Sequence, residues 1–302
     1  MIRRVLSILF LMATISVQGQ MNFQDSSVQV ISYWNLGDTY EYSVSLQKLQ
    51  YTETDTTTNE TITYDVEVSV IDSTENSYVV KWFYKNFKSD SPNPIVQKLA
   101  AVSENIAVNI KLDELGMIQS VENWEEVRDY MAKAIDLIKS EFGQIPGMDR
   151  VLQKLSGMYS TKESIEAGAI QDVLQFHNFH GGRYVLNEEL RGQIQTPNLY
   201  YIDKPLDTDL MIRLEDLDKK NNQYVIRSIQ AVNSEQLIES TYNFLKETSA
   251  AVIQKEDFLG IKNTAENVSR IHNTGWVLES VLWKEVVLQG VTSLEIRTIL
   301  MK

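Results

Sequence analysis

The sequence predicts an α+β fold in which a large, curled antiparallel β-sheet, open like a half-barrel, packs on a three-helix insertion. Apolar and polar residues alternate in segments before and after residues 123–180, as in strands with one buried face. Within about 123–180 the apolar spacing is instead that of amphipathic helices. Because no linker-like segment divides the chain, we expect residues 20–302 to form a single domain. Two small β-domains joined through the helices are the alternative.

The first 19 residues, MIRRVLSILFLMATISVQG, have the three-part layout of a secretory signal peptide. Arg3 and Arg4 give a basic start, residues 5–17 are mostly apolar, and small or medium-sized residues precede a cleavage site after Gly19. The apolar run is shorter than the roughly 20 residues that span a bilayer. We therefore expect a cleaved signal helix, a secreted or periplasmic protein, and no transmembrane segment in the mature chain.

The N-terminal third predicts antiparallel strands. Residues 40–46 and 62–70 alternate regularly, and the Thr-rich segment YTETDTTTNET between them predicts a long hairpin end. A third strand covers residues 78–87, and SDSPNP predicts a loop because it holds two prolines. A second hairpin follows over residues 105–121, with its turn at residues 114–116.

Three helices form the predicted insertion. The first follows Asn123, a candidate N-cap, with Glu126 three residues later as in a capping box. The second covers about residues 148–158, and the third begins at Ser160, with Glu163 completing S-x-x-E. After the insertion, residues 206–214 and 224–232 predict a hairpin, residues 234–251 a helix with Ser234 as cap, and the remaining residues further strands.

Composition excludes several classes of function. The formal net charge is −13 and becomes more negative when Arg3 and Arg4 are removed with the signal peptide, which disfavours nucleic acid as a partner. The chain has no cysteine, so disulfides, thiolate metal sites and cysteine nucleophiles are excluded. G-x-x-x-x-G-K-[ST] and G-x-G-x-x-G phosphate loops are also absent. We expect no cofactor.

The signal peptide, the opening strand GDTYEY, the run of strand, glycine turn and strand into NWEEV, and the late TGW resemble uncharacterised secreted proteins of Gram-negative bacteria. The order of elements also resembles the periplasmic lipoprotein carriers, open half-barrels whose concave face is covered by helices and binds acyl chains. These resemblances imply a location in the bacterial cell envelope. The second implies a half-barrel fold and a lipid ligand, but none of the carriers' ligand-contacting residues can be matched in this chain.

Two of the three histidines lie in FHNFHGGRY, at positions 177 and 180. They continue the apolar stripe of the third predicted helix and precede Gly181 and Gly182, which are typical of a helix end. The simplest interpretation is therefore a histidine-bearing last turn. The alternative is a metal site, which needs at least three protein ligands in a catalytic zinc centre, with His272 as the third histidine.

Other candidate motifs are weaker. His180-Gly181-Gly182 is similar to an oxyanion-hole segment, but no G-x-S-x-G nucleophile motif accompanies it. DLDKKNN begins like a calcium loop but has lysine and asparagine where oxygen ligands and glycine belong, so it predicts a turn. Asp207 and Asp209 share one face of a strand, which is insufficient for a catalytic pair.

The aromatic and methionine side chains suggest a binding role. If the sheet is curled, some aromatic side chains face its interior and form an apolar pocket, with the helices as a pliable lid. The candidate ligand-binding residues are Tyr42, Tyr64, Trp82, Met131 and Trp276. We expect a non-enzymatic secreted or periplasmic protein whose partner is a lipid, another apolar or amphipathic ligand, or an envelope protein. The alternatives are a metal-dependent hydrolase using His177 and His180, and a surface protein-interaction module.

Overall fold

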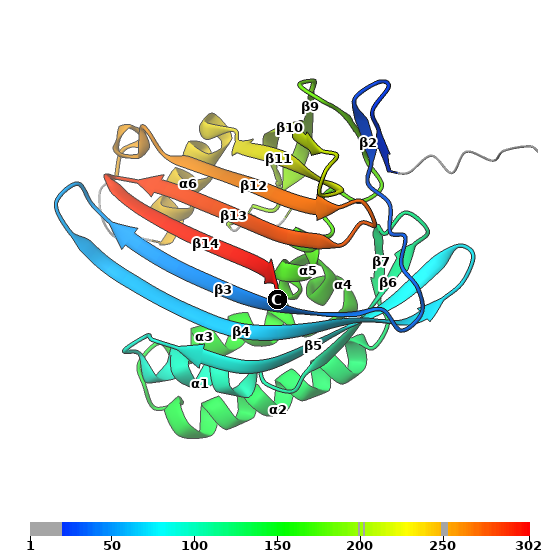
Figure 1. The fold of residues 1–302 in the computed structure, drawn as a ribbon. Coiled ribbons are helices and arrows are strands. Elements are labelled where there is room, and N and C mark those ends of the chain that lie inside the picture. Colours follow the sequence, from blue (N-terminus) through cyan, green and yellow to red (C-terminus); the bar gives the residue numbers. More distant parts are fainter. Residues whose placement is uncertain (1–19, 199, 202, 249–252) are drawn as a thin grey trace, which may run out of the picture.

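A computed structural model describes residues 20–198, 200–201, 203–248 and 253–302. Within these residues, eleven antiparallel strands form one curved sheet in the order β7-β6-β5-β4-β3-β14-β13-β12-β11-β10-β9 (Figure 1). The sheet is not closed, because β7 and β9 are edge strands. The chain is thus an α+β protein, as predicted. The predicted signal peptide, residues 1–19, lies outside the described residues.

The first half of the sheet contains three long strands and a short hairpin. Their bounds are β3 Thr39–Tyr51, β4 Thr56–Ser73, β5 Ser77–Ser89, β6 Ala107–Asp113 and β7 Ile118–Val121. The long Thr-rich hairpin end was wrongly predicted: β3 and β4 pair through most of this segment, and only residues 52–55 form the turn. Threonine favours strands whether or not apolar residues alternate with it, which explains the error.

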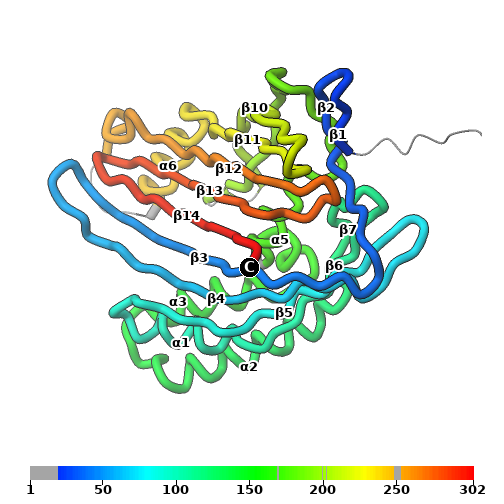
Figure 2. The backbone as a smooth tube through the Cα atoms, in the orientation of Figure 1, coloured from blue at the N-terminus to red at the C-terminus, as the bar shows by residue number. Residues whose placement is uncertain are grey.

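The second half of the sheet consists of strands that follow residue 188 in the sequence. Its bounds are β9 Glu189–Thr196, β10 Leu206–Asp218, β11 Gln223–Val232, β12 Lys262–His272, β13 Val277–Leu288 and β14 Val291–Met301. β14 pairs with β3 from Thr292↔Tyr51 to Met301↔Tyr42. This pairing joins the early strands to the late ones, so the two halves share one sheet rather than forming two. Figure 2 shows β14 running beside β3 along its length.

Helices cover the inner face of the sheet, which is the face that carries Tyr42, Trp82 and Ile299. Figure 1 shows α1 and α2 beneath the β4–β5 side and α3 to α5 behind the sheet. The bounds are α1 Pro94–Val102, α2 Trp124–Phe142, α3 Met148–Met158, α4 Lys162–Ser164, a π-helical turn Ile165–Ala169, α5 Gln171–Phe176 and α6 Ser234–Thr248. A 3-10 turn covers Lys255–Phe258. None of the described helices is long and apolar enough to cross a membrane.

Helix α1 was not predicted, because the prolines of SDSPNP were interpreted as a loop. The second proline, Pro94, instead occupies the first turn of α1, where a missing N–H costs nothing. Asn93 caps the helix by accepting a hydrogen bond from the Ile95 amide at 2.9 Å. The helical layer therefore begins about 30 residues earlier than the predicted insertion.

Several caps also differ from the prediction. Asn123 does not cap α2, because its side-chain oxygen accepts a hydrogen bond from the backbone N–H of Asn109 in β6 at 2.8 Å. The third predicted helix is divided into α4, the π-helical turn and α5, and its capping box uses Thr161 and Ser164 rather than Ser160 and Glu163. Helix α6 is capped by Asn233 instead of Ser234, because the Asn233 side-chain oxygen accepts a hydrogen bond from the backbone N–H of Gln236 at 3.0 Å. Residues 249–251, predicted helical, lie outside the described residues.

The main core lies between the inner face of the sheet and α5. Fully buried side chains of β3, β4 and β5 meet Phe176 of α5, which stacks edge-on against Tyr42 and Trp82. A small sheet of β1 (Met21–Asn22), β2 (Ser27–Gln29) and β8 (Arg183–Val185) covers one end of this core. At the other end, Leu237 of α6 packs with Leu206, Val232 and Ile261 in a separate cluster. A third cluster, formed by Ile138, Met148 and Leu152, joins the helices α2 and α3, and the candidate site lies beside it and the main core.

Candidate functional site: a cavity between the sheet and the helices

A cavity of about 310 Å³ lies between the inner face of the sheet and the helices. Its wall is mostly apolar and comes from β3 to β6 on one side and from α1, α2 and α3 on the other. The apolar side chains that line it are Leu46, Ile62, Phe87, Leu99, Ala100, Ile106, Val108, Val127, Met131, Met158 and Ile170. Gly168 of the π-helical turn also lines it. The volume is about twice that of an engineered ~150 Å³ cavity that binds benzene.

The buried carboxylate of Asp172 forms one polar part of the wall. Asp172 is 5% exposed and accepts hydrogen bonds from Tyr84 Oη at 3.0 Å and from Tyr64 Oη at 3.2 Å. Burial, reinforced by this carboxylate, raises the pKa of both tyrosines well above the usual value. Both hydroxyls therefore stay protonated at all physiological pH values and act as hydrogen-bond donors to Asp172.

The second polar part of the wall is Arg297 of β14, which is 7% exposed. Its Nη2 donates to Glu295 Oε1 at 3.2 Å. Its Nη1 is buried and has no hydrogen-bond partner within the described part of the chain. A buried guanidinium nitrogen without an acceptor costs free energy, so Arg297 is the least satisfied charged group of the cavity.

A polar groove of about 130 Å³ adjoins the cavity, and Gln171 lines both. Its walls are mostly polar side chains of the sheet and of the segment around α5. The polar side chains are Gln171, Gln175, Asn178, Ser228, Gln230, Asn267 and Lys284, and the apolar ones are Leu174, Leu282 and Ala265. Lys284 Nζ donates to Gln171 Oε1 at 3.2 Å. Burial, together with the charge of Arg297, lowers the pKa of Lys284. Two cationic side chains thus lie near the boundary of cavity and groove.

A larger hollow of about 760 Å³ lies over the outer face of β3 to β5 and β14. Thr63, Asn86 and Lys88 line it and are exposed. Its lining residues are mostly polar and it exposes less apolar surface than the inner cavity does, so burial of a ligand there gains less from the removal of apolar surface from water. We therefore place the candidate site in the smaller, inner cavity.

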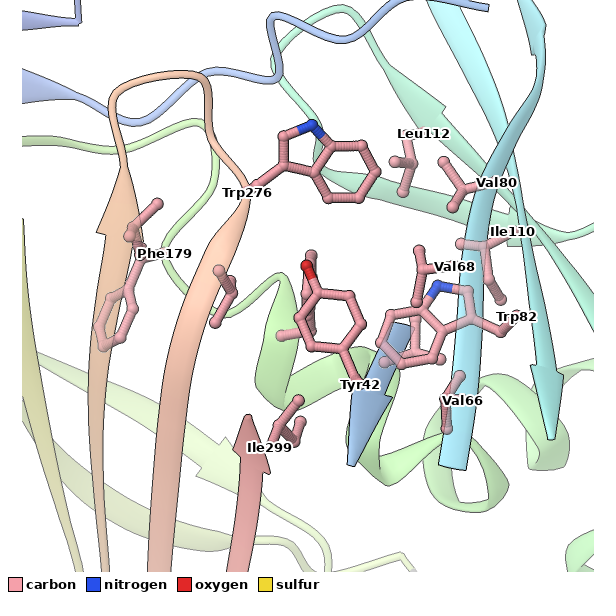
Figure 3. Packing of buried hydrophobic residues seen from close by; sticks show 14 of the residues in the cluster. Tyr42, Val66, Val68, Val80, Trp82, Ile110, Leu112, Phe179, Trp276 and Ile299 are labelled. Carbon is pink, nitrogen blue, oxygen red and sulfur yellow. The ribbon is translucent and has the colours of Figure 1, made fainter. Parts of the chain in front are cut away.

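The structure brings together two of the five predicted ligand-binding residues. Tyr64 and Met131 line the cavity. Tyr42, Trp82 and Trp276 are instead packed in the main core, each at most 3% exposed (Figure 3). These three side chains do face inward, but they pack in the core instead of lining the cavity. Alternation along a strand identifies its inner face, but it does not show which part of that face is filled by a helix and which part is left open.

His177 and His180 lie just after α5, with ring centroids 4.9 Å apart. His177 Nδ1 donates to the Gly116 carbonyl and His180 Nε2 to the Gly275 carbonyl, each at 2.9 Å. His272 Nδ1 is bonded to Thr274 Oγ1 at 2.8 Å. The residues that the structure describes contain no group of three or more His, Cys, Asp or Glu side chains that could hold a metal ion. The pair therefore ties the end of the helical block to two turns of the sheet.

Asp172 and Arg297 were not identified from the sequence. Arg297 stands two residues before Ile299 and so shares its inward face, which is a detectable signal. Asp172 lies beside the apolar stripe of its helix and gives no such signal. Its role depends on Tyr64 and Tyr84, which are distant in sequence.

Comparisons with known proteins find a likeness at the level of structure. No family model matches the chain, and no curated protein matches it. A solved structure described as "Lipid-protein interactions in lipovitellin" aligns with 89% of this chain and 25% of that chain, at 10% sequence identity and a TM-score of 0.42. The chain thus spans a quarter of that protein's length. Because no family is matched, the two family resemblances drawn from the sequence stay predictions.

Proposed function

We propose that this protein binds an apolar or amphipathic ligand in the cavity between its sheet and helices, without transforming it. The observation that carries the proposal is the cavity itself. Its 310 Å³ lie at the lower end of the ~300–1,000 Å³ typical of ligand sites, and its apolar wall is interrupted by a few polar groups. Such a wall gives affinity through burial of apolar surface, while the polar groups orient the ligand.

The helical wall is suited to admit a ligand. Met131 and Met158 are unbranched and flexible side chains that adapt to different shapes. The π-helical turn Ile165–Ala169, which contributes Gly168, interrupts the helical hydrogen-bond pattern beside the cavity. π-helical turns are frequent at functional sites. We place the entrance on this side, away from the continuous strands of the sheet.

We further propose that binding takes place outside the cytoplasm, in the periplasm or after secretion. The support is the signal-peptide layout of residues 1–19. N-terminal sequencing of protein exported from a bacterial host tests it: a mature chain that begins at Gln20 is the expected result, and retention of residues 1–19 in the cytoplasm contradicts it.

The binding proposal is tested with N-phenyl-1-naphthylamine, a neutral apolar dye whose fluorescence rises on leaving water. Ala100 of α1 is buried and lines the cavity, whereas its neighbour Ala101 is exposed. Ala100→Phe places a ring in the cavity, and we expect it to weaken dye binding by about tenfold, equal to ~1.4 kcal/mol. Ala101→Phe is the matched control and should change binding less than about twofold.

Solvent extraction of the purified protein, followed by mass spectrometry, gives an independent measurement. A co-purifying apolar molecule in the wild type that is depleted in Ala100→Phe is the expected result. The proposal is wrong if the wild type neither binds the dye nor carries such a molecule.

A further inference from the structure

The boundary between the cavity and the groove has a chemical character that narrows the class of ligand. On the cavity side the wall is apolar, and on the groove side it consists of amides and hydroxyls. Arg297 lines the cavity and Lys284 lines the groove. They belong to the neighbouring strands β14 and β13, where Arg297 pairs with Leu282 and Lys284 with Glu295.

We propose, on the basis of the binding function above, that the ligand is a single-chain amphiphile with an anionic head group, and that Arg297 binds this head group. The apolar chain occupies the cavity, and the head group lies at its boundary with the groove. A carboxylate or a phosphate ester supplies the oxygen acceptors that a guanidinium fork binds best.

The hydrogen bonding of Arg297 supports an anionic partner. Within the described residues its only ion pair is with Glu295, at 3.2 Å through Nη2, and Nη1 is buried without an acceptor. A ligand oxygen beside Nη1 would give a charge-assisted hydrogen bond in a site largely withdrawn from water, where such bonds are strong.

The other charged groups around the boundary are compatible with this arrangement. Both oxygens of Asp172 already accept tyrosine hydroxyls, so this carboxylate is hydrogen-bonded without Arg297. Glu295 engages the other guanidinium nitrogen. Lys284 adds a second positive charge close enough to Arg297 that the two repel. An anion bound between them relieves this repulsion.

Four probes with the same ten-carbon chain separate the head group from the chain: decanoate, decyl phosphate, decanol and decylammonium. Each is titrated against the dye-loaded wild-type protein. We expect decanoate, decyl phosphate or both to displace the dye at a concentration at least about tenfold lower than the concentration of decanol that displaces it. A difference of this size corresponds to one charge-assisted hydrogen bond. Preference for one of the two anions identifies the head group.

Arg297→Met keeps a long, apolar side chain and removes the charge. We expect it to weaken binding of the preferred anion by about ten- to a hundredfold and that of decanol by less than about twofold. Arg297→Lys should retain part of the preference, because it keeps the charge but not the fork. The matched control is Arg270→Met on β12, since Arg270 forms an exposed ion pair with Glu279 at 3.2 Å. It should leave all four affinities unchanged.

The outcomes distinguish the two proposals. If none of the probes displaces the dye and no dye binds, the binding function itself is wrong. If the chain binds but decanol equals the anions, or decylammonium is preferred, only the anionic head group is wrong. If Arg297→Met is unstable, Arg297→Lys decides: full retention of the ratio between anion and decanol in that variant contradicts recognition by the guanidinium fork.

Discussion

At the scale of single residues, the two buried histidines make the folded protein sensitive to acid. His177 and His180 are 5% and 6% exposed, and their rings lie against Trp34 and Phe176. Burial lowers the pKa of His177 well below its usual value, and burial likewise lowers the pKa of His180 to about 4. Both are therefore neutral in the folded protein at neutral pH, and each uses one ring N–H to bind a turn carbonyl.

We predict that the folded protein loses stability as the pH falls from 7 to 4.5 because of these histidines. The unfolded chain binds protons near the usual histidine pKa of 6.5, whereas folded His180 does so only near 4. Between these values protons favour the unfolded state, and His180 alone should reduce the free energy of unfolding by about 2 kcal/mol or more. Urea denaturation at a series of pH values measures this change.

His180→Gln keeps a donor toward Gly275 but cannot be protonated, so its loss between pH 7 and 4.5 should be smaller than that of the wild type. His272→Gln is the control, because the hydrogen bonds of the His272 ring in the described structure are with Thr274, in the same turn. A pH profile of His180→Gln that parallels the wild type would show that acid acts through other groups, such as the hydrogen-bonded carboxylates.

At the scale of elements, tight turns hold the N-terminal segment against the sheet. Gly275, in the turn between β12 and β13, has φ +85°, and a Cβ there would lie 2.3 Å from the Ile31 carbonyl oxygen. Gly37 has φ +90°, and no atom of the residues that the structure describes lies within 4 Å of a Cβ built there. The two glycines share the left-handed conformation and differ in the space around them, so they form a natural pair for comparison.

We predict that Gly37→Ala lowers the free energy of unfolding by about 1 kcal/mol, from backbone strain alone. Gly275→Ala should cost at least about 2 kcal/mol more, because backbone atoms must move as well. Urea denaturation of both variants at pH 7 measures the difference. Equal losses would mean that residue 31 moves away freely and that this turn does not hold the N-terminal segment.

Elements with a clear period could be predicted from the sequence. The strands around Tyr42, the hairpin turn after Asp218 and helix α3 are all where alternation, turn residues or helical spacing place them. The prediction of helix boundaries and caps was wrong where the same residue type is compatible with two local structures. Pro94 begins a helix rather than extending a loop, and Asn123 serves the neighbouring strand rather than capping α2. A cap is decided by which backbone group comes within reach, and only the fold determines that.

At the scale of the whole molecule, the pairing of β3 with β14 makes the two halves of the sheet continuous. We therefore predict that the protein unfolds in a single cooperative transition. Tryptophan fluorescence and far-ultraviolet circular dichroism should give coincident urea curves, since tryptophans lie in both halves, at Trp82 and Trp276 among others.

Two separated transitions would instead support two domains. Thr298→Pro tests the connection directly: Thr298 pairs with Ser45 on one side and Val281 on the other, so a proline there disrupts a central strand. We expect the variant to lose several kcal/mol of stability, or to separate the transition in two.

The sequence predicts the large curled sheet, but it cannot predict the site within it. Tyr64 and Met131 were identified as inward-facing, and they do line the cavity. Asp172 and Arg297 belong to the site because they interact with Tyr64, which lies more than a hundred positions away from each of them in the sequence. Such long-range contacts depend on the order of the strands in the sheet, which periodicity along one segment does not reveal.

The β3–β14 pairing also constrains the time course of folding. Tyr42 finds its partner Met301 only after about 260 further residues have been synthesised. Until then, β3 presents a long edge of unpaired backbone groups, which other chains can join. Proteins dominated by such distant contacts fold slowly and are exposed to aggregation while they do so. During its synthesis this protein should therefore need a chaperone that shields the unpaired β3 edge until β14 is available. A protein built from local hairpins needs such protection less.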